Sequence, residues 1–203
     1  MARLARALLL AAVTFCLVAP SASAAPTNLG KTLGNLWTTV LETPTPDNPF
    51  EGGGPQCVVL GDKIVAPFGG GTFTCTVKAG TRIFIAAWTT ECSSFPGDHG
   101  TFGTTEADLR ACALAMDAGI TATVTINGEP VPLSSVETGP LTIHLPQDNI
   151  FPNVKGADRK GLSVAHGFVY LTDPLTPGTY IIEGHVVFPD GSTADFTTTI
   201  IVQ

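Results

Sequence analysis

Charge is scarce in this chain, and basic charge is scarcest. Lysine, arginine, aspartate and glutamate make up 13% of the 203 residues, against about 25% in typical soluble proteins. Ten basic residues stand against seventeen acidic ones, so the formal net charge is −7, and the basic residues form no cluster. A surface of this sign repels nucleic acid and anionic lipid, which excludes nucleic acid as a partner.

Aromatic platforms for sugar binding are missing as well. The chain has two tryptophans and two tyrosines. Trp37 and Trp88 fall on apolar faces of their segments, and Tyr180 points toward the expected core. We therefore expect none of the exposed tryptophan or tyrosine rings that would stack on a sugar.

Long hydrophobic runs are limited to the N-terminus. Arg3 and Arg6 precede an apolar run at 8–19, and a small-residue sequence follows at 22–24. This pattern predicts a secretory signal peptide at 1–24, so we expect the mature protein to be secreted to the extracellular space. The apolar run is too short to span a bilayer and the chain ends without a hydrophobic tail, so no transmembrane anchor is predicted.

Close cysteine pairs, which structural zinc sites use, do not occur either. One cysteine lies in the signal peptide, and the four others are separated by 18, 17 and 20 positions. Such spacings favour disulfides, for which three connectivities are open. We predict the most local one, Cys57–Cys75 with Cys92–Cys112, in which each bridge closes a loop of about 20 residues and contributes roughly 3 kcal/mol by restricting the unfolded chain.

The residues that follow the signal peptide, 25–203, are enough for one domain with a buried core. Apolar residues at helical spacing predict an amphipathic helix at 28–42, and prolines and glycines predict a loop at 43–55. A second, inserted helix is predicted at 105–118, because a capping box begins it and Gly119 is placed to end it.

The rest of the chain predicts β-structure. The segment 81–90 is apolar on both faces, with Ile83 and Ile85 on one and Phe84 and Trp88 on the other, as in a central strand covered from both sides. We therefore predict a mainly β fold, an antiparallel β-sandwich of immunoglobulin-like or jelly-roll-like type with two helices and two disulfides. The predicted strands are 58–60, 64–67, 72–77, 81–90, 121–126, 141–145, 163–171, 179–188 and 193–202.

The last hairpin allows a register prediction. A three-residue loop at 190–192 would place Val186 opposite Phe196 and keep the apolar residues of both strands on one face. In this register His185 lies opposite Thr197 and diagonal to Asp195. We expect His185 to be a solvated residue of the sheet.

Several short segments, with the four cysteines in matching order, resemble a widespread family of secreted bacterial proteins known as signal-peptide proteins, which have no assigned activity. The resemblance implies the secreted class and supports the cysteine pairing, and it lends no catalytic residue. His166 departs from it, because that family has an acidic residue before the corresponding Gly167 and aromatic residue. The segments are 48–50 (NPF), 75–80 (CTVKAG), 90–93 (TECS), 105–112 (TEADLRAC), 145–149 (LPQDN) and 175–180 (LTPGTY).

Candidate catalytic residues are few. Ser163 lies in a sequence that approximates the G-x-S-x-G elbow, but that motif needs a strand-to-helix turn and a strand continues here. Glu91, Asp98, His99 and His166 would form an acid/base or metal site if the fold brought their loops together. Otherwise they are scattered surface groups, and this is the interpretation we favour.

Two other features suggest a ligand less strongly. Asp148 and Asn149 lie in an oxygen-rich turn that would suit calcium, but the spacing of an EF-hand loop is missing and such residues usually bond their own backbone. We therefore predict no metal and no cofactor. Four loop phenylalanines either plug the core beneath the loops, which we favour, or form a patch that faces a partner: Phe50, Phe68, Phe95 and Phe102.

Three functions remain open. We favour a non-catalytic extracellular binding module, with an extracellular ligand or a component of the cell envelope as its partner. The first alternative is a secreted hydrolase that uses the four acid/base candidates. The second is a structural or protective secreted protein, whose surface would show no binding feature.

Overall fold

The structure is a computed structural model and describes residues 28–51, 53–61, 63–95, 102–151 and 153–203. The predicted signal peptide lies outside these residues. The described part contains eleven strands and two α-helices, so the mainly β fold with two helices is confirmed. None of its helices is long and apolar enough to cross a membrane.

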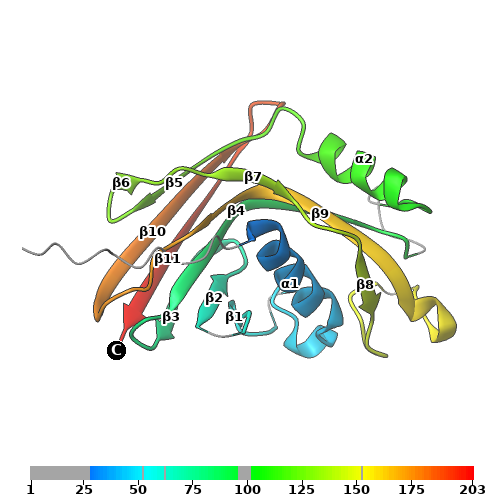
Figure 1. Ribbon diagram of the computed structural model, residues 1–203, viewed down its shortest axis with the longest axis horizontal. Coiled ribbons are helices and arrows are strands. Elements are labelled where there is room, and N and C mark those ends of the chain that lie inside the picture. Colours follow the sequence, from blue (N-terminus) through cyan, green and yellow to red (C-terminus); the bar gives the residue numbers. More distant parts are fainter. Residues whose placement is uncertain (1–27, 52, 62, 96–101, 152) are drawn as a thin grey trace, which may run out of the picture.

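The strands form two sheets (Figure 1), in the orders β1-β2-β4-β9-β7, with β8 also beside β9, and β3-β11-β10-β5-β6. The first sheet contains β1 (Cys57–Val59), β2 (Ile64–Pro67), β4 (Arg82–Ser93), β7 (Ser134–Glu137), β8 (Leu141–His144) and β9 (Lys160–Leu171). The second contains β3 (Gly71–Val77), β5 (Thr121–Ile126), β6 (Glu129–Pro130), β10 (Gly178–Val187) and β11 (Thr193–Val202). All nine predicted strands are present, and β6 and β7 are additional.

The antiparallel prediction is wrong for two pairs of strands. β2 pairs with β4 in parallel, and β3 pairs with β11 in parallel. The chain leaves the first sheet after β2, runs through β3 in the second sheet, and returns in β4. This return through the other sheet lets β2 and β4 run in the same direction.

The first sheet is covered on both faces. One face packs against the second sheet, where Ile83 and Ile85 of β4 meet Ile182 and Ile200. The other face packs against α1 (Leu29–Glu42), whose apolar stripe joins a cluster with Phe84. In Figure 1, α1 lies beneath the arch formed by β4 and β9. The prediction that β4 is a central, doubly covered strand is therefore confirmed at these positions.

A bulge in β4 changes the face of the residues that follow it. Ala86 pairs with Val169, but Trp88 pairs with Phe168, so one residue of β4 is extra. Trp88 is thereby turned away from α1, and its ring lies 4.9 Å from that of Phe188. The prediction that Trp88 shares a face with Phe84 is wrong for this reason.

The predicted disulfides are both formed. Cys57–Cys75 joins β1 of the first sheet to β3 of the second. Cys92–Cys112 joins β4 to α2 (Glu106–Met116), which lies on the same side of the first sheet as the second sheet. Each bridge therefore ties two packed layers together.

The capping box that begins α2 is also confirmed. The Thr105 hydroxyl accepts a hydrogen bond from the Asp108 N–H, and the Asp108 carboxylate accepts one from the Thr105 N–H. Hydrogen bonds from Thr105 and Thr104 hold the pKa of Asp108 below its usual value. Leu109 of this helix is fully buried, whereas Met116 is 47% exposed.

The register of the β10–β11 hairpin is shifted by two residues from the prediction. Gly184, not Val186, lies opposite Phe196, because the Phe196 ring covers the glycine and a Cβ there would come within 2.0 Å of it. The shift is an even number of residues, so the apolar residues keep their faces. His185 now lies directly opposite Asp195, and its Nδ1 is 2.6 Å from the Asp195 Oδ1 on the exposed face.

Candidate functional site

The structure does not bring the four predicted acid/base residues together. Asp98 and His99 lie outside the described residues. Glu91 and His166 lie on the neighbouring strands β4 and β9, but on opposite faces, because Glu91 pairs with Ala165 and successive side chains alternate. Glu91 is buried and accepts a hydrogen bond from the Ser163 hydroxyl. The predicted hydrolase site is therefore not formed by Glu91 and His166.

Ser163 lies where the sequence placed it, inside a strand. It is fully buried in β9, and the chain continues as strand for eight more residues to Leu171. A serine in this position has no elbow to expose its hydroxyl. Its hydrogen bond to Glu91 gives it a structural role.

The turn that holds Asp148 and Asn149 uses its amide to order the backbone. The Asn149 Nδ2 donates to the carbonyl oxygens of Pro146 and Val154 at 3.0 and 3.2 Å, and its Oδ1 accepts from the Phe151 N–H at 2.9 Å. Within the described residues, no three histidine, cysteine, aspartate or glutamate side chains form a group that could hold a metal ion.

We expect metal chelation to leave the melting temperature of the protein unchanged, because Asn149 is committed to the backbone. Thermal unfolding with and without EDTA measures this. A bound calcium at 100 times its dissociation constant would add about 2.7 kcal/mol. A fall of several degrees in EDTA that calcium restores, and that is lost in Asp148→Ala, would contradict the expectation.

The four loop phenylalanines divide into two kinds. Phe95 is fully buried and packs against Phe151, with ring centroids 5.5 Å apart, so it is a plug. Phe50 and Phe102 are 59% and 47% exposed, so the preferred interpretation is wrong for both. Phe68 is partly buried. The exposed ring of Phe50 suggests a binding surface at the side of α1.

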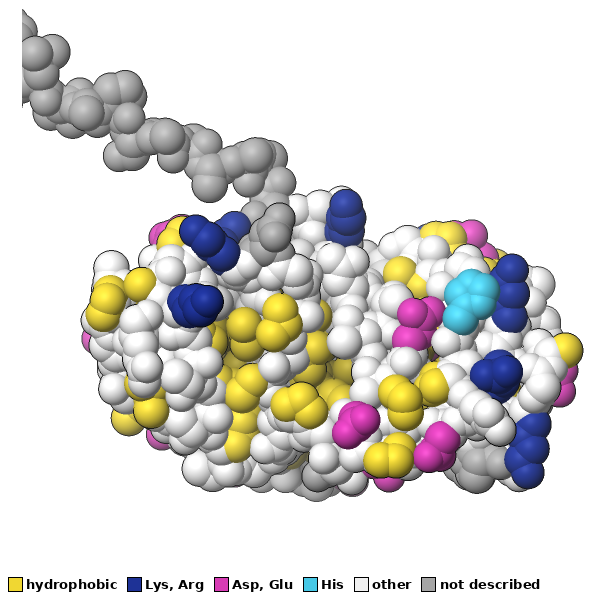
Figure 2. Space-filling view, turned by 90° about the horizontal axis from the view of Figure 1, so that it is seen from below, with side chains coloured by type: hydrophobic (Ala, Val, Ile, Leu, Met, Phe, Trp, Pro, Cys, Tyr) yellow, Lys and Arg dark blue, Asp and Glu magenta, His cyan; other side chains and the backbone are white. Residues whose placement is uncertain are grey.

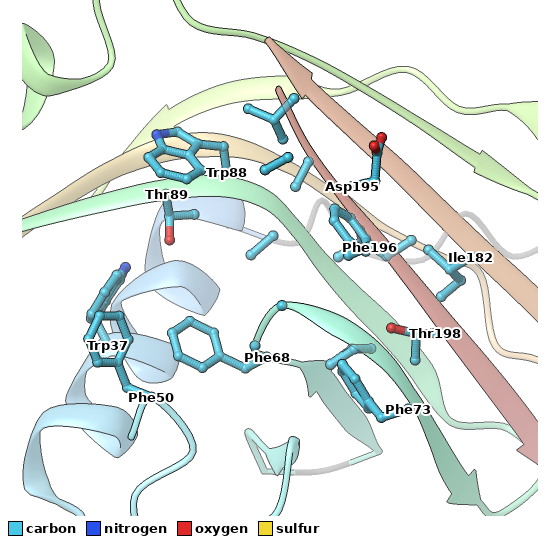
Figure 3. A pocket seen from close by; sticks show the side chains of 18 residues that line it. Trp37, Phe50, Phe68, Phe73, Trp88, Thr89, Ile182, Asp195, Phe196 and Thr198 are labelled. Carbon is cyan, nitrogen blue, oxygen red and sulfur yellow. The ribbon is translucent and has the colours of Figure 1, made fainter. Parts of the chain in front are cut away.

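Phe50 lies at the mouth of an apolar cavity with a volume of about 310 Å³. One wall is an aromatic cluster in which the Trp37 ring lies 5.7 Å from that of Phe68 and 6.5 Å from that of Phe50. The facing wall comes from the second sheet and includes Phe196 and Ile182 (Figure 3). Figure 2 shows apolar side chains gathered around a hollow on this face of the molecule.

The floor of this cavity is the free edge of a strand. Five consecutive residues of β4, 85–89, line the cavity. Along the edge of β4 that faces away from β9, β2 pairs with β4 only as far as Ile83. The next pairing on that edge is the isolated bridge between Ser93 and Phe102. Within the described part of the chain, no strand pairs with the edge between them. Such an edge presents backbone donors and acceptors to a further strand.

Two polar side-chain atoms at the cavity are buried without a hydrogen-bond partner in the described structure. They are the Trp37 Nε1 and the Thr198 Oγ1. Both side chains are more than nine-tenths buried. In Figure 3 the Thr89 hydroxyl and the nitrogen edge of Trp37 point toward each other across the cavity. A buried polar group without a partner costs about 1–3 kcal/mol, so a ligand that satisfies these atoms is favoured.

Two polar side chains that are distant from His166 in the sequence contact its ring. Its Nδ1 lies 2.6 Å from the Asp117 Oδ2, and its Nε2 lies 3.0 Å from the Ser135 Oγ. Neither Asp117 nor Ser135 was predicted as a site residue. Asp117 follows the end of α2, and Ser135 lies in β7, a strand that was not predicted, so no local motif marks them.

No protein family and no curated protein sequence matches this chain. A solved cysteine protease inhibitor, EhICP2 from Entamoeba histolytica, is 12% identical over 69% of this chain and 94% of its own, with a TM-score of 0.29. The solution structure of Amebosin is 14% identical over 66% of this chain and 99% of its own, with a TM-score of 0.24. TM-scores this low transfer neither a fold nor a function.

Proposed function

We propose that this protein is a secreted, extracellular binding module that takes an extended apolar peptide segment against the free edge of β4. The observation that carries the proposal is this unpaired edge, which forms the floor of an aromatic-lined cavity. The signal-peptide pattern and the two disulfides support an oxidising, extracellular setting. Membership of the secreted four-cysteine family is part of this proposal.

An extended peptide fits the cavity better than a compact molecule does. A strand added to β4 would satisfy those backbone groups of 85–89 that point away from β9, which a small apolar ligand would leave to water. Successive side chains of a strand point to opposite faces. One set would meet Trp37 and Phe50, and the alternate set would meet Ile182 and Phe196. The two apolar walls therefore match the two faces of one strand.

The buried polar atoms add a second requirement. The Trp37 Nε1 donates only, so it needs an acceptor, such as a backbone carbonyl of the bound segment. Thr198 can donate or accept. Asp195 also lines the cavity, and its carboxylate lies 2.6 Å from the His185 Nδ1, so one end of the site carries an acidic side chain. A largely apolar segment with a basic residue at that end is the best match.

The binding test uses a defined probe. An acetylated and amidated hexapeptide of alternating valine and threonine, with one terminal lysine, is titrated into the protein while tryptophan fluorescence is recorded. Both tryptophans of the chain line the cavity, so their emission reports binding. The control peptide has the same side chains but carries N-methyl groups on alternate residues of its strand-pairing edge. We expect the first peptide to bind and the second to bind at least tenfold more weakly.

We expect Phe50→Ser to weaken binding of the hexapeptide about tenfold, which corresponds to about 1.4 kcal/mol. The side chain is 59% exposed, so its loss should leave the melting temperature nearly unchanged. Phe102→Ser is the matched control, because Phe102 is 47% exposed and does not line the cavity. Its affinity should equal that of the unaltered protein.

Three results would contradict the proposal. Equal binding of the methylated peptide would show that the backbone of β4 takes no part. Equal loss of affinity in Phe50→Ser and Phe102→Ser would show that the cavity is not the site. Saturable binding of a small apolar probe such as 1-anilinonaphthalene-8-sulfonate, together with no binding of the peptide, would assign the cavity to a compact ligand. If neither the peptide nor the small probe binds, the result would favour the alternative that this is a structural or protective secreted protein.

A further inference from the structure

We propose that Ser135, His166 and Asp117 form an esterase site, in which Ser135 is the nucleophile, His166 is the general base, and Asp117 is a positioning residue. None of the three residues lines the cavity at β4, although Trp88, which does, donates to Asp117. The three residues come from three elements: the end of α2, β7 and β9. The substrate class is carboxylic esters with a short apolar acyl group.

The surroundings of Asp117 fix its role. Its carboxylate is 3% exposed. The Oδ1 accepts hydrogen bonds from the Trp88 Nε1 at 3.0 Å and from the Thr90 Oγ1 at 2.5 Å. Because Trp88 can only donate, Oδ1 is an acceptor, and Oδ2 is left to face His166 at 2.6 Å. Asp117 is thus a buried acceptor held in place by two further side chains.

This arrangement selects the tautomer of His166. With Asp117 as an acceptor, the Nδ1 carries the proton, so the Nε2 of the neutral ring has a free lone pair. That lone pair faces the Ser135 Oγ at 3.0 Å, which is hydrogen-bonding distance for removing the hydroxyl proton. Glu137 lies opposite His166 on β7, but its carboxylate is engaged by Arg110 of α2. The order carboxylate, imidazole and hydroxyl is that of a catalytic triad.

Ser135 is placed to react with a molecule from solvent. It is exposed and lies on β7, an edge strand of the first sheet. The Thr138 N–H donates to the Ala165 carbonyl, and hydrogen-bonded pairs alternate along an antiparallel ladder. The pair Ser135–Phe168 lies three positions along the ladder from the hydrogen-bonded pair Thr138–Ala165, so it is a non-hydrogen-bonded pair. The Ser135 N–H therefore points away from β9. This N–H is a donor for the oxyanion that forms at a carbonyl attacked by the Ser135 Oγ.

An apolar cavity beside Ser135 gives the acyl group a place. Its volume is about 390 Å³, and its walls include Phe168, Val131 and Leu133 together with β5. Phe168 faces Ser135 across the ladder, and its ring also lies edge-on to His166 with centroids 6.1 Å apart. Phe168, the ladder partner of Ser135, thus connects the cavity to the nucleophile, and the apolar walls suit a short alkyl chain.

The reaction follows the usual two stages of acyl transfer to water. In the first, the Ser135 Oγ bonds to the acyl carbon, its proton passes to the His166 Nε2, and the bond from the acyl carbon to the alcohol oxygen breaks. The alcohol leaves with that proton. In the second, water attacks the acyl carbon and gives a proton to the Nε2, and the bond to Ser135 breaks. The acid leaves, and the Ser135 hydroxyl regains its proton.

The test is covalent labelling with a fluorophosphonate probe, followed by peptide mass spectrometry. We expect a single adduct on Ser135 in the folded protein, and hydrolysis of 4-nitrophenyl butyrate that the adduct abolishes. His166→Gln should slow labelling at least 100-fold, because the general base is lost.

The control is Ser134→Ala, because Ser134 is the exposed neighbour on β7 whose side chain points to the other face. It should be labelled at the rate of the unaltered protein, while Ser135→Ala should carry no adduct. The proposal is overturned if Ser135 is not labelled, if the heat-unfolded protein is labelled as fast, or if His166→Gln is labelled at an unchanged rate while its circular dichroism shows a folded protein. Peptide binding at β4 should be the same in Ser135→Ala, so the two proposals fail independently.

Discussion

Reduction of both disulfides should lower the melting temperature by well over ten degrees. Each bridge closes a loop of about 20 residues and, by restricting the unfolded chain, contributes roughly 3 kcal/mol to the free energy of unfolding. Reduction of both bridges therefore removes about 6 kcal/mol. In a domain of this size, 1 kcal/mol corresponds to about 2–4 °C. Calorimetry with and without dithiothreitol measures the shift. A reduced protein that melts within a few degrees of the oxidised one would contradict this account.

The two bridges can be separated, because they hold different layers. Cys57–Cys75 joins the two sheets, and Cys92–Cys112 holds α2 on β4. Replacing either pair with serine should give about half of the full shift. Only the loss of Cys92–Cys112 should also slow the labelling of Ser135, because Asp117 directly follows α2.

Much of this fold could be predicted from local patterns. The predicted strands have apolar alternation or apolar runs, α1 has apolar residues at helical spacing, and α2 has a capping box that begins at Thr105. β7 was missed because it is a four-residue edge strand with the sequence SSVE, which has neither an apolar run nor a turn signal. Short edge strands are defined by their neighbours rather than by their own residues.

Errors of register came from contacts that no local pattern encodes. The hairpin shift arises because the Phe196 ring lies over Gly184, and the turned face of Trp88 arises from a bulge whose position depends on β9. Both sites depend on these details. Trp88 reaches Asp117 only because of the bulge, and so the carboxylate that orients His166 could not be deduced from sequence spacing.

The cavity at β4 was partly visible in the sequence. Phe50 and Phe68 are two of the loop phenylalanines for which a partner-facing patch was the less favoured prediction, and both line the cavity. The strand edge was not visible, because it depends on β2 pairing with β4 over only two residues, Ile64 and Val65. An apolar central strand such as β4 gives no sign of which of its edges is left open.

Asp117→Ala should destabilise the protein by about 3–9 kcal/mol. The substitution leaves three donors without their acceptor, those of Trp88, Thr90 and His166, and each such loss in a buried setting costs about 1–3 kcal/mol. The free energy of unfolding in urea measures the effect. Asp195→Ala is the matched control, because the Asp195 carboxylate lies at the same distance of 2.6 Å from a histidine, His185, but is 71% exposed.

Asp195→Ala should lower the free energy of unfolding by less than about 1 kcal/mol, because water competes for both side chains of an exposed pair. The two histidine–aspartate contacts have the same length but differ in burial. Comparing the two substitutions therefore shows how much of the loss of stability is due to burial. If the two substitutions cost the same, the hydrogen bonds around Asp117 would not be what holds α2 against β4 and β9. If Asp117→Ala costs several kcal/mol and Asp195→Ala almost nothing, the carboxylate beside His166 is a fixed part of the core, as a group that orients a general base must be.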